Sequence, residues 1–128
     1  MPNQPNTPID EARFEAEWEQ DQELLAQLAA NGDVATIART VDVSFIGREQ
    51  ALEVLAEAAE DLGFEFGQFV PDEDAEEEGQ WRLDLDIVQT IEPEAVKALT
   101  RKCLEIEATY SGVEYDGWGC MATTGAND

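Results

Sequence analysis

The chain has 128 residues, of which 30 are Asp or Glu and 7 are Lys or Arg, so its formal net charge is −23 and its pI is about 4.1. A chain of this length fits one domain with a single hydrophobic core. The charge argues against direct binding to nucleic acid or to anionic membranes, and it favours a basic protein partner.

The N-terminal part of the chain divides into an arm and a helix. Residues 1–8 carry three prolines and no acid, so we expect a disordered arm. The arm also lacks the basic start and the apolar run of a signal peptide, which predicts a cytoplasmic protein. A helix is predicted over residues 9–31, because apolar side chains recur on one stripe from Phe14 to Leu28. This helix could dock against the rest of the domain or project from it.

The first strand is predicted over residues 34–46. Val41, Val43 and Phe45 alternate there with polar residues, which is the period of a strand with one buried face. The first five residues fit this pattern less well and are compatible with a loop. Gly47 is expected to end the strand.

A second helix is predicted over residues 48–62, and Gly63 is its expected C-cap. Its buried stripe consists of Leu52, Leu55, Ala59 and Leu62. A second strand follows over residues 64–70, with Phe64 and Phe66 expected on one face.

Residues 71–79 form an acidic segment between a proline and a glycine, which predicts a solvated hairpin loop. Its acids, which are also candidates for partner contact, are Asp72, Glu73, Asp74, Glu76, Glu77 and Glu78. The segment does not fit a calcium-binding EF-hand loop. The alignment puts Glu77 where that loop needs glycine and Leu83 where it needs a bidentate Glu.

Residues 80–88 contain the clearest strand pattern of the chain. The alternating apolar residues are Trp81, Leu83, Leu85 and Ile87. A third helix is predicted to begin at or near Pro93, with Cys103 as a core thiol on its apolar stripe. The last strand is expected over residues 113–119, and a flexible tail over 122–128.

The order of elements predicts a single α+β domain over residues 9–121. Two strand-helix-strand units in tandem are typical of the ferredoxin-like split βαβ sandwich, here with an extra N-terminal helix. Right-handed crossovers place two helices on one face of a four-stranded antiparallel sheet, with the first and third strands at its centre. Alternation assigns to the opposite, uncovered face Thr40, Asp42, Ser44, Arg82, Asp84, Asp86, Glu114 and Asp116.

Trp118 lies between Gly117 and Gly119, and glycines inside a strand mark a bulge or a close backbone approach. Strict alternation places the indole outward, with Glu114 and Asp116, whereas a bulge would turn it into the core. We expect the outward orientation and a role as an anchor for a partner, since interface hot spots are enriched in tryptophan.

Three features resemble the regulator of ribonuclease activity B (RraB) family, over about residues 33–121. They are the run Val113-Glu-Tyr-Asp-Gly-Trp-Gly119, the Leu62-Gly-Phe-Glu65 junction and the acidic hairpin. The resemblance implies a small cytoplasmic protein that binds ribonuclease E and restrains its RNA processing. It also implies that the contact involves the regulatory, largely disordered half of that enzyme and not the RNA.

The combined prediction is a non-enzymatic acidic regulator that binds ribonuclease E, without cofactor or metal, and with an oligomeric state that the sequence leaves open. The expected contact residues are Trp118, the acids of the uncovered face and those of the hairpin. The alternative is an immunity- or antitoxin-type inhibitor of another basic enzyme. A third class is a hydrolase that uses Asp84 and Asp86 as paired carboxylates, although such a pair is more often the solvated side of a strand.

Overall fold

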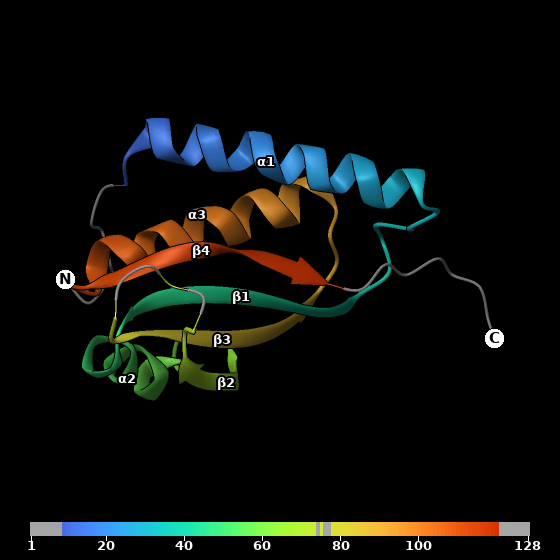
Figure 1. Cartoon of the computed structure of the whole chain (residues 1–128). Helices are drawn as coiled ribbons and strands as arrows, with labels where there is room; N and C mark the ends of the chain where they lie inside the picture. Colours follow the sequence, from blue (N-terminus) through green and yellow to red (C-terminus); the bar gives the residue numbers. More distant parts are fainter. Residues whose placement is uncertain (1–8, 74, 76–77, 121–128) are drawn as a thin grey trace.

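The computed structural model describes residues 9–73, 75 and 78–120, so the predicted arm and tail lie outside the described residues (Figure 1). The elements are, in chain order, α1 (Glu11–Ala30), β1 (Arg39–Arg48), α2 (Glu49–Ala58), β2 (Glu65–Pro71), β3 (Gln80–Gln89), α3 (Pro93–Thr109) and β4 (Val113–Cys120). No helix in this part of the chain combines the length and the apolar character needed to cross a membrane.

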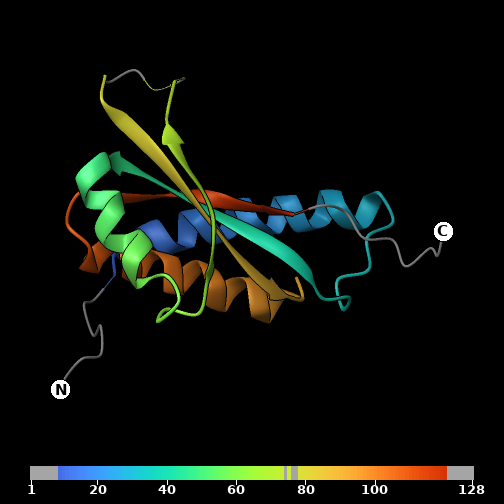
Figure 2. The same cartoon turned by 90° about the horizontal axis from the view of Figure 1, so that it is seen from below.

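The strands form one antiparallel sheet in the order β2-β3-β1-β4. This confirms the predicted α+β fold with β1 and β3 at its centre. The crossover helices α2 and α3 cover one face of the sheet (Figure 2), which we call the helix face. The core lies between these layers and includes Val43, Phe45 and Leu85 from the sheet, with Leu55 from α2 and Cys103 from α3.

The helix α1 docks on the helix face, antiparallel to α3 and next to β4 (Figure 1). Asp10 caps it by accepting a hydrogen bond from the backbone N–H of Ala12, and Phe14 is buried in the core. Basic residues of α3 hold the two helices together, because Arg101 lies 4.4 Å from the ring centroid of Phe14 and Lys97 lies 5.6 Å from that of Trp18.

Gly47 was predicted to end the first strand, and Gly63 was predicted to cap the second helix. The prediction for Gly47 is wrong. β1 continues through Gly47 to Arg48 instead of ending at Gly47. A Cβ atom at Gly47 would lie 2.3 Å from the carbonyl oxygen of Gly112, so the glycine serves a close approach within the sheet. Gly63 has φ +95°, as its predicted C-cap role requires, although α2 itself already ends at Ala58.

Phe64 and Phe66 both point to the helix side, which agrees with the prediction that they share one face, but they differ in burial. Phe64 is buried just before β2 begins, whereas Phe66 is 59% exposed within it. Phe66 pairs with Leu85 and therefore faces the helices, but α2 packs mainly on β1 and β3 and leaves this edge strand uncovered. A bulge at Gly67 then shifts the register of β2 against β3.

Candidate functional site: the open face of the sheet

The face of the sheet opposite the helices is built in rows, because paired residues on neighbouring antiparallel strands point to the same side. We call it the open face. Its three central rows across β2, β3, β1 and β4 are Val70–Arg82–Ile46–Glu114, Gln68–Asp84–Ser44 and Glu65–Asp86–Asp42–Gly119. Asp116 lies on the same face beside Ser44, and Thr40 and Val88 pair at its far end. The predicted assignment of polar and acidic residues to this face is therefore confirmed.

Asp84 is the centre of a hydrogen-bonded network on the open face. Its Oδ1 accepts from Ser44 Oγ at 2.6 Å and from Arg82 Nε at 3.1 Å, and its Oδ2 accepts from Gln68 Nε2 at 2.7 Å. Arg82 also donates to Ser44 Oγ at 2.9 Å. Burial disfavours the charged form, but these hydrogen bonds and the Arg82 charge outweigh it and lower the pKa of Asp84. Asp84 is thus a fixed anion, and its lowered pKa is the opposite of what a general acid requires.

The row Glu65–Asp86–Asp42 places three carboxylates side by side on three strands. Burial raises the pKa of Asp42, and the charges of Asp84 and Asp86 raise it further. Like charges directly opposite one another on neighbouring strands destabilise a sheet. This end of the open face therefore favours a cationic ligand. Within the described residues, no group of three or more Asp, Glu, Cys or His side chains has the arrangement of a metal site.

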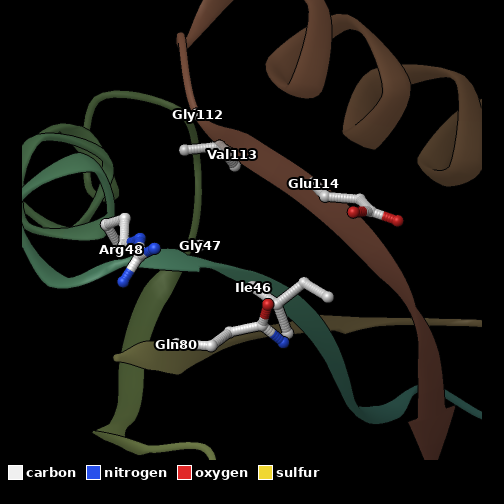
Figure 3. A pocket seen from close by; sticks show the side chains of 7 residues that line it. All are labelled: Ile46, Gly47, Arg48, Gln80, Gly112, Val113 and Glu114. Carbon is white, nitrogen blue, oxygen red and sulfur yellow. The ribbon is translucent and has the colours of Figure 1, made fainter. Parts of the chain in front are cut away.

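The other end of the open face carries a hollow of about 360 Å³. Open-face side chains of Ile46, Arg48, Gln80 and Glu114 line it, and Figure 3 shows Arg48 and Glu114 on opposite sides of it. Arg48 Nη1 donates to the carbonyl oxygen of Glu78 at 2.9 Å, which attaches the end of the hairpin to β1. The open face therefore offers an extended polar surface with a hollow at this end.

The described hairpin acids, Asp72, Glu73 and Glu78, lie at a distance from the row Glu65–Asp86–Asp42. Asp72 accepts a 3.2 Å hydrogen bond from Gln80 Nε2 at the start of β3, whereas Asp86 lies near the end of that strand. Glu73 and Glu78 are exposed, and the predicted contact residues Asp74, Glu76 and Glu77 lie outside the described residues. The structure thus separates Asp72, Glu73 and Glu78 from the acids at the other end of the open face.

The expected outward orientation of Trp118 is wrong. Tyr115 pairs with Phe45 and Trp118 pairs with Val43, so Asp116 and Gly117 both lie opposite Ser44. Gly117 has φ +105°, which a residue with a side chain rarely adopts, and this bulge turns the indole to the helix face. There Trp118 Nε1 donates a 2.8 Å hydrogen bond to Asp21 of α1. Trp118 is therefore separated from Glu114 and Asp116, with which strict alternation grouped it.

Two side chains that no sequence pattern predicts close the outer edge of β4. Glu107 of α3 accepts hydrogen bonds from the backbone N–H of Tyr115 at 2.8 Å and from Arg13 Nη2 at 2.7 Å. Arg13 Nη2 also donates to the carbonyl oxygen of Tyr115 at 3.1 Å. The Arg13–Glu107 ion pair therefore bonds to the backbone N–H and C=O of Tyr115, where a neighbouring strand would otherwise pair. No local sequence pattern predicts this arrangement, because Arg13, Glu107 and Tyr115 lie on α1, α3 and β4.

Comparison with protein families matches residues 18–120 to the model of the family described as Regulator of ribonuclease activity B. The match spans α1 beyond its first turns and every other element of the sheet and its helices. Comparison with curated proteins finds no match.

Proposed function

Because the chain belongs to the regulator of ribonuclease activity B family, we propose that it binds ribonuclease E and thereby restrains RNA processing and decay by that enzyme. The description of the family supports the regulation of a ribonuclease. Ribonuclease E as the partner, and direct binding without catalysis as the mode of action, are the further steps of the proposal. We also propose that the protein acts in the cytoplasm.

The observation that carries the proposal is the excess of negative charge on the open face. The row Glu65–Asp86–Asp42 contains only acids, and Glu114 and Asp116 are exposed on the neighbouring edge strand. Protein segments that hold RNA are basic, because they must neutralise phosphates. An acidic sheet face is complementary to such a segment, and a partner segment that occupies it is no longer free to bind RNA.

Within the open face, the acids have different roles in the proposal. Asp84 already accepts hydrogen bonds from three side chains, so it holds the face in shape. Asp86, Asp42, Glu114 and Asp116 are the proposed contacts. The hairpin acids Asp72, Glu73, Asp74, Glu76, Glu77 and Glu78 contribute mainly long-range attraction, which governs the rate of association more than the stability of the complex.

The test combines binding with activity. The purified chain is titrated into ribonuclease E, and complex formation and RNA cleavage are followed in the same samples at low and high salt. The proposal expects a stoichiometric complex that weakens as salt rises, together with a matching loss of cleavage. Absence of any complex at low salt contradicts it. Inhibition of a different basic enzyme, with ribonuclease E unaffected, would support the immunity- or antitoxin-type alternative.

A further inference from the structure

A groove of about 420 Å³ lies between α1 and the second half of β4. One of its walls is the stripe Glu17, Asp21 and Leu24, which recurs every three or four residues along α1. The opposite wall is Gly117 and Trp118 on β4. The groove opens at the sheet edge formed by β4, where hydrogen bonds from Arg13 to Tyr115 and from Trp118 to Asp21 join α1 to that strand. It is separate from the rows of the open face.

The indole of Trp118 is held as a rigid wall of this groove. The bulge at Gly117 turns it to the helix face, and its Nε1 atom is fixed by the hydrogen bond to Asp21. Its ring remains partly exposed to the groove. A Cβ atom at Gly117 would meet no other atom within 4 Å, so the space beside the indole is open.

The charged residues that line the groove are acidic. They are Glu17, Asp21 and Glu23, and the remaining polar lining residues are the amides Gln20 and Gln27. Burial raises the pKa of Glu17, although Arg13 opposes this shift, and the charges of Asp21 and Asp116 raise the pKa further. Asp116, on the open-face side of β4, is thus close enough to the groove to act on Glu17.

We propose that this groove receives an arginine side chain from the basic segment of the protein partner. An aromatic face attracts a cation, and a guanidinium can stack flat on an indole while its N–H groups donate to carboxylates. Glu17 and Glu23 line the groove and supply its acceptors; Glu17 already accepts a 3.2 Å hydrogen bond from Arg13 Nη1, and Asp21 remains occupied by Trp118 and Thr100. The groove thus adds one specific contact to the diffuse attraction of the open face. This inference rests on the proposed function.

Arginine is favoured over lysine by the shape of the groove wall. A planar guanidinium matches the flat indole and retains donors for two separate carboxylates, whereas an ammonium group is a compact and strongly hydrated charge. The length of α1 between Glu17 and Leu24 spans about two helical turns, roughly 10 Å. The partner segment would therefore cross the edge of β4 and insert a single side chain.

The test introduces a competing cation into the groove. Gln20 lines the groove and is exposed, so Gln20→Arg places a guanidinium there from the chain itself. Gln22→Arg is the matched control, because it makes the same change two residues away on α1, at an exposed position that does not line the groove. The affinity for ribonuclease E of each full-length variant is measured by calorimetry, and the indole N–H resonance of Trp118 is followed by NMR.

We expect Gln20→Arg to weaken binding about tenfold relative to Gln22→Arg, which corresponds to the loss of one desolvated cation–aromatic contact. Equal affinities for the two variants would overturn the inference. A second measurement titrates the wild-type chain with an arginine–serine peptide and with its lysine–serine counterpart. The arginine peptide is expected to shift the Trp118 indole resonance more, and equal or absent shifts would also overturn the inference.

Different results contradict binding to ribonuclease E and use of the groove. If the wild-type chain forms no complex with ribonuclease E, the proposed function fails, whereas the peptide titration still reports on the groove. If ribonuclease E binds the two Gln→Arg variants equally well, the groove is not used and the proposed function stands on the open face.

Discussion

The indole Nε1 of Trp118 donates a 2.8 Å hydrogen bond to Oδ1 of Asp21, which joins the last strand to the first helix across 97 residues of sequence. The second oxygen of Asp21 accepts a 2.5 Å hydrogen bond from Thr100 Oγ1 on α3. Asp21 is only 4% exposed. One buried carboxylate therefore holds together α1, α3 and β4.

Replacement of Trp118 by alanine is expected to lower stability, because the indole packs against the core and its N–H satisfies Asp21. Aromatic truncations in cores cost about 3–5 kcal/mol, and the partial exposure of Trp118 places it near the lower end. Trp118→Phe keeps most of the packing but leaves one oxygen of Asp21 without its donor, at a cost of about 1–3 kcal/mol. Urea denaturation of both variants measures these effects. An alanine variant with unchanged stability would show that the indole contributes nothing to the fold.

A second prediction concerns the pH dependence of stability. Burial raises the pKa of Asp21, and the hydrogen bonds from Thr100 and Trp118 only partly offset it. The folded protein therefore binds a proton here more tightly than the unfolded chain does. The stability that protonation of Asp21 contributes is fully present below the ordinary pKa of 3.8, and it is lost as pH rises through the pKa of Asp21 in the folded protein. We expect the stability of the wild type relative to Asp21→Asn to fall as pH rises above the ordinary pKa of 3.8.

Asp84 is a control, because its effect on stability should change with pH in the opposite direction to that of Asp21. Its hydrogen bonds lower its pKa, so its stabilising effect is present above the ordinary pKa of 3.8 and is lost as pH falls through the folded value. The stability of the wild type relative to Asp84→Asn should therefore decrease on acidification. Denaturation midpoints across the pH range give both curves. Parallel curves for the wild type and Asp21→Asn would contradict the assignment of a raised pKa to Asp21.

Much of the fold follows from periodicity along the chain, and the exceptions have physical causes. Alternation in β1 and β3 separates the buried Val43 and Leu85 correctly from Asp42 and Asp86 on the open face. Gly117 indicated a bulge in the sequence. The direction in which the indole of Trp118 points depends on the register of β4 against β1, which the sequence does not give. The burial of Asp21 was not predictable, because its hydrogen-bond donors are distant in sequence.

A third prediction tests the closure of the β4 edge. Glu107→Ala removes the acceptor of the Tyr115 backbone N–H and the partner of Arg13. We expect the amide of Tyr115 to exchange with solvent at least about tenfold faster, with a loss of stability of about 1–3 kcal/mol. Glu105→Ala, two residues earlier on the same helix, is the control for the removal of a carboxylate. If exchange at Tyr115 is the same in both variants, the ion pair does not protect the edge.

The two thiols are expected to differ in reactivity. Burial raises the pKa of both Cys103 and Cys120, but Cys103 is completely buried whereas Cys120 is partly exposed. Cys103 should therefore react with iodoacetamide only as fast as the protein unfolds, and Cys120 should react sooner. Mass spectrometry of pulse-labelled protein separates the two sites, and unfolding in urea should make their rates similar. Rapid labelling of native Cys103 would mean that the core opens without global unfolding.

The central claim is that the open face binds ribonuclease E, and its most direct test is a comparison of two charge-matched double variants. Asp86→Lys with Glu114→Lys changes the open face, whereas Glu53→Lys with Glu94→Lys makes the same change in net charge at exposed positions on α2 and α3. The measurement is the dissociation constant of each complex with ribonuclease E at one salt concentration. The account predicts at least about tenfold weaker binding for the open-face variant and a much smaller change for the helix variant. Equal losses in the two variants, or no loss in the open-face variant, would contradict it.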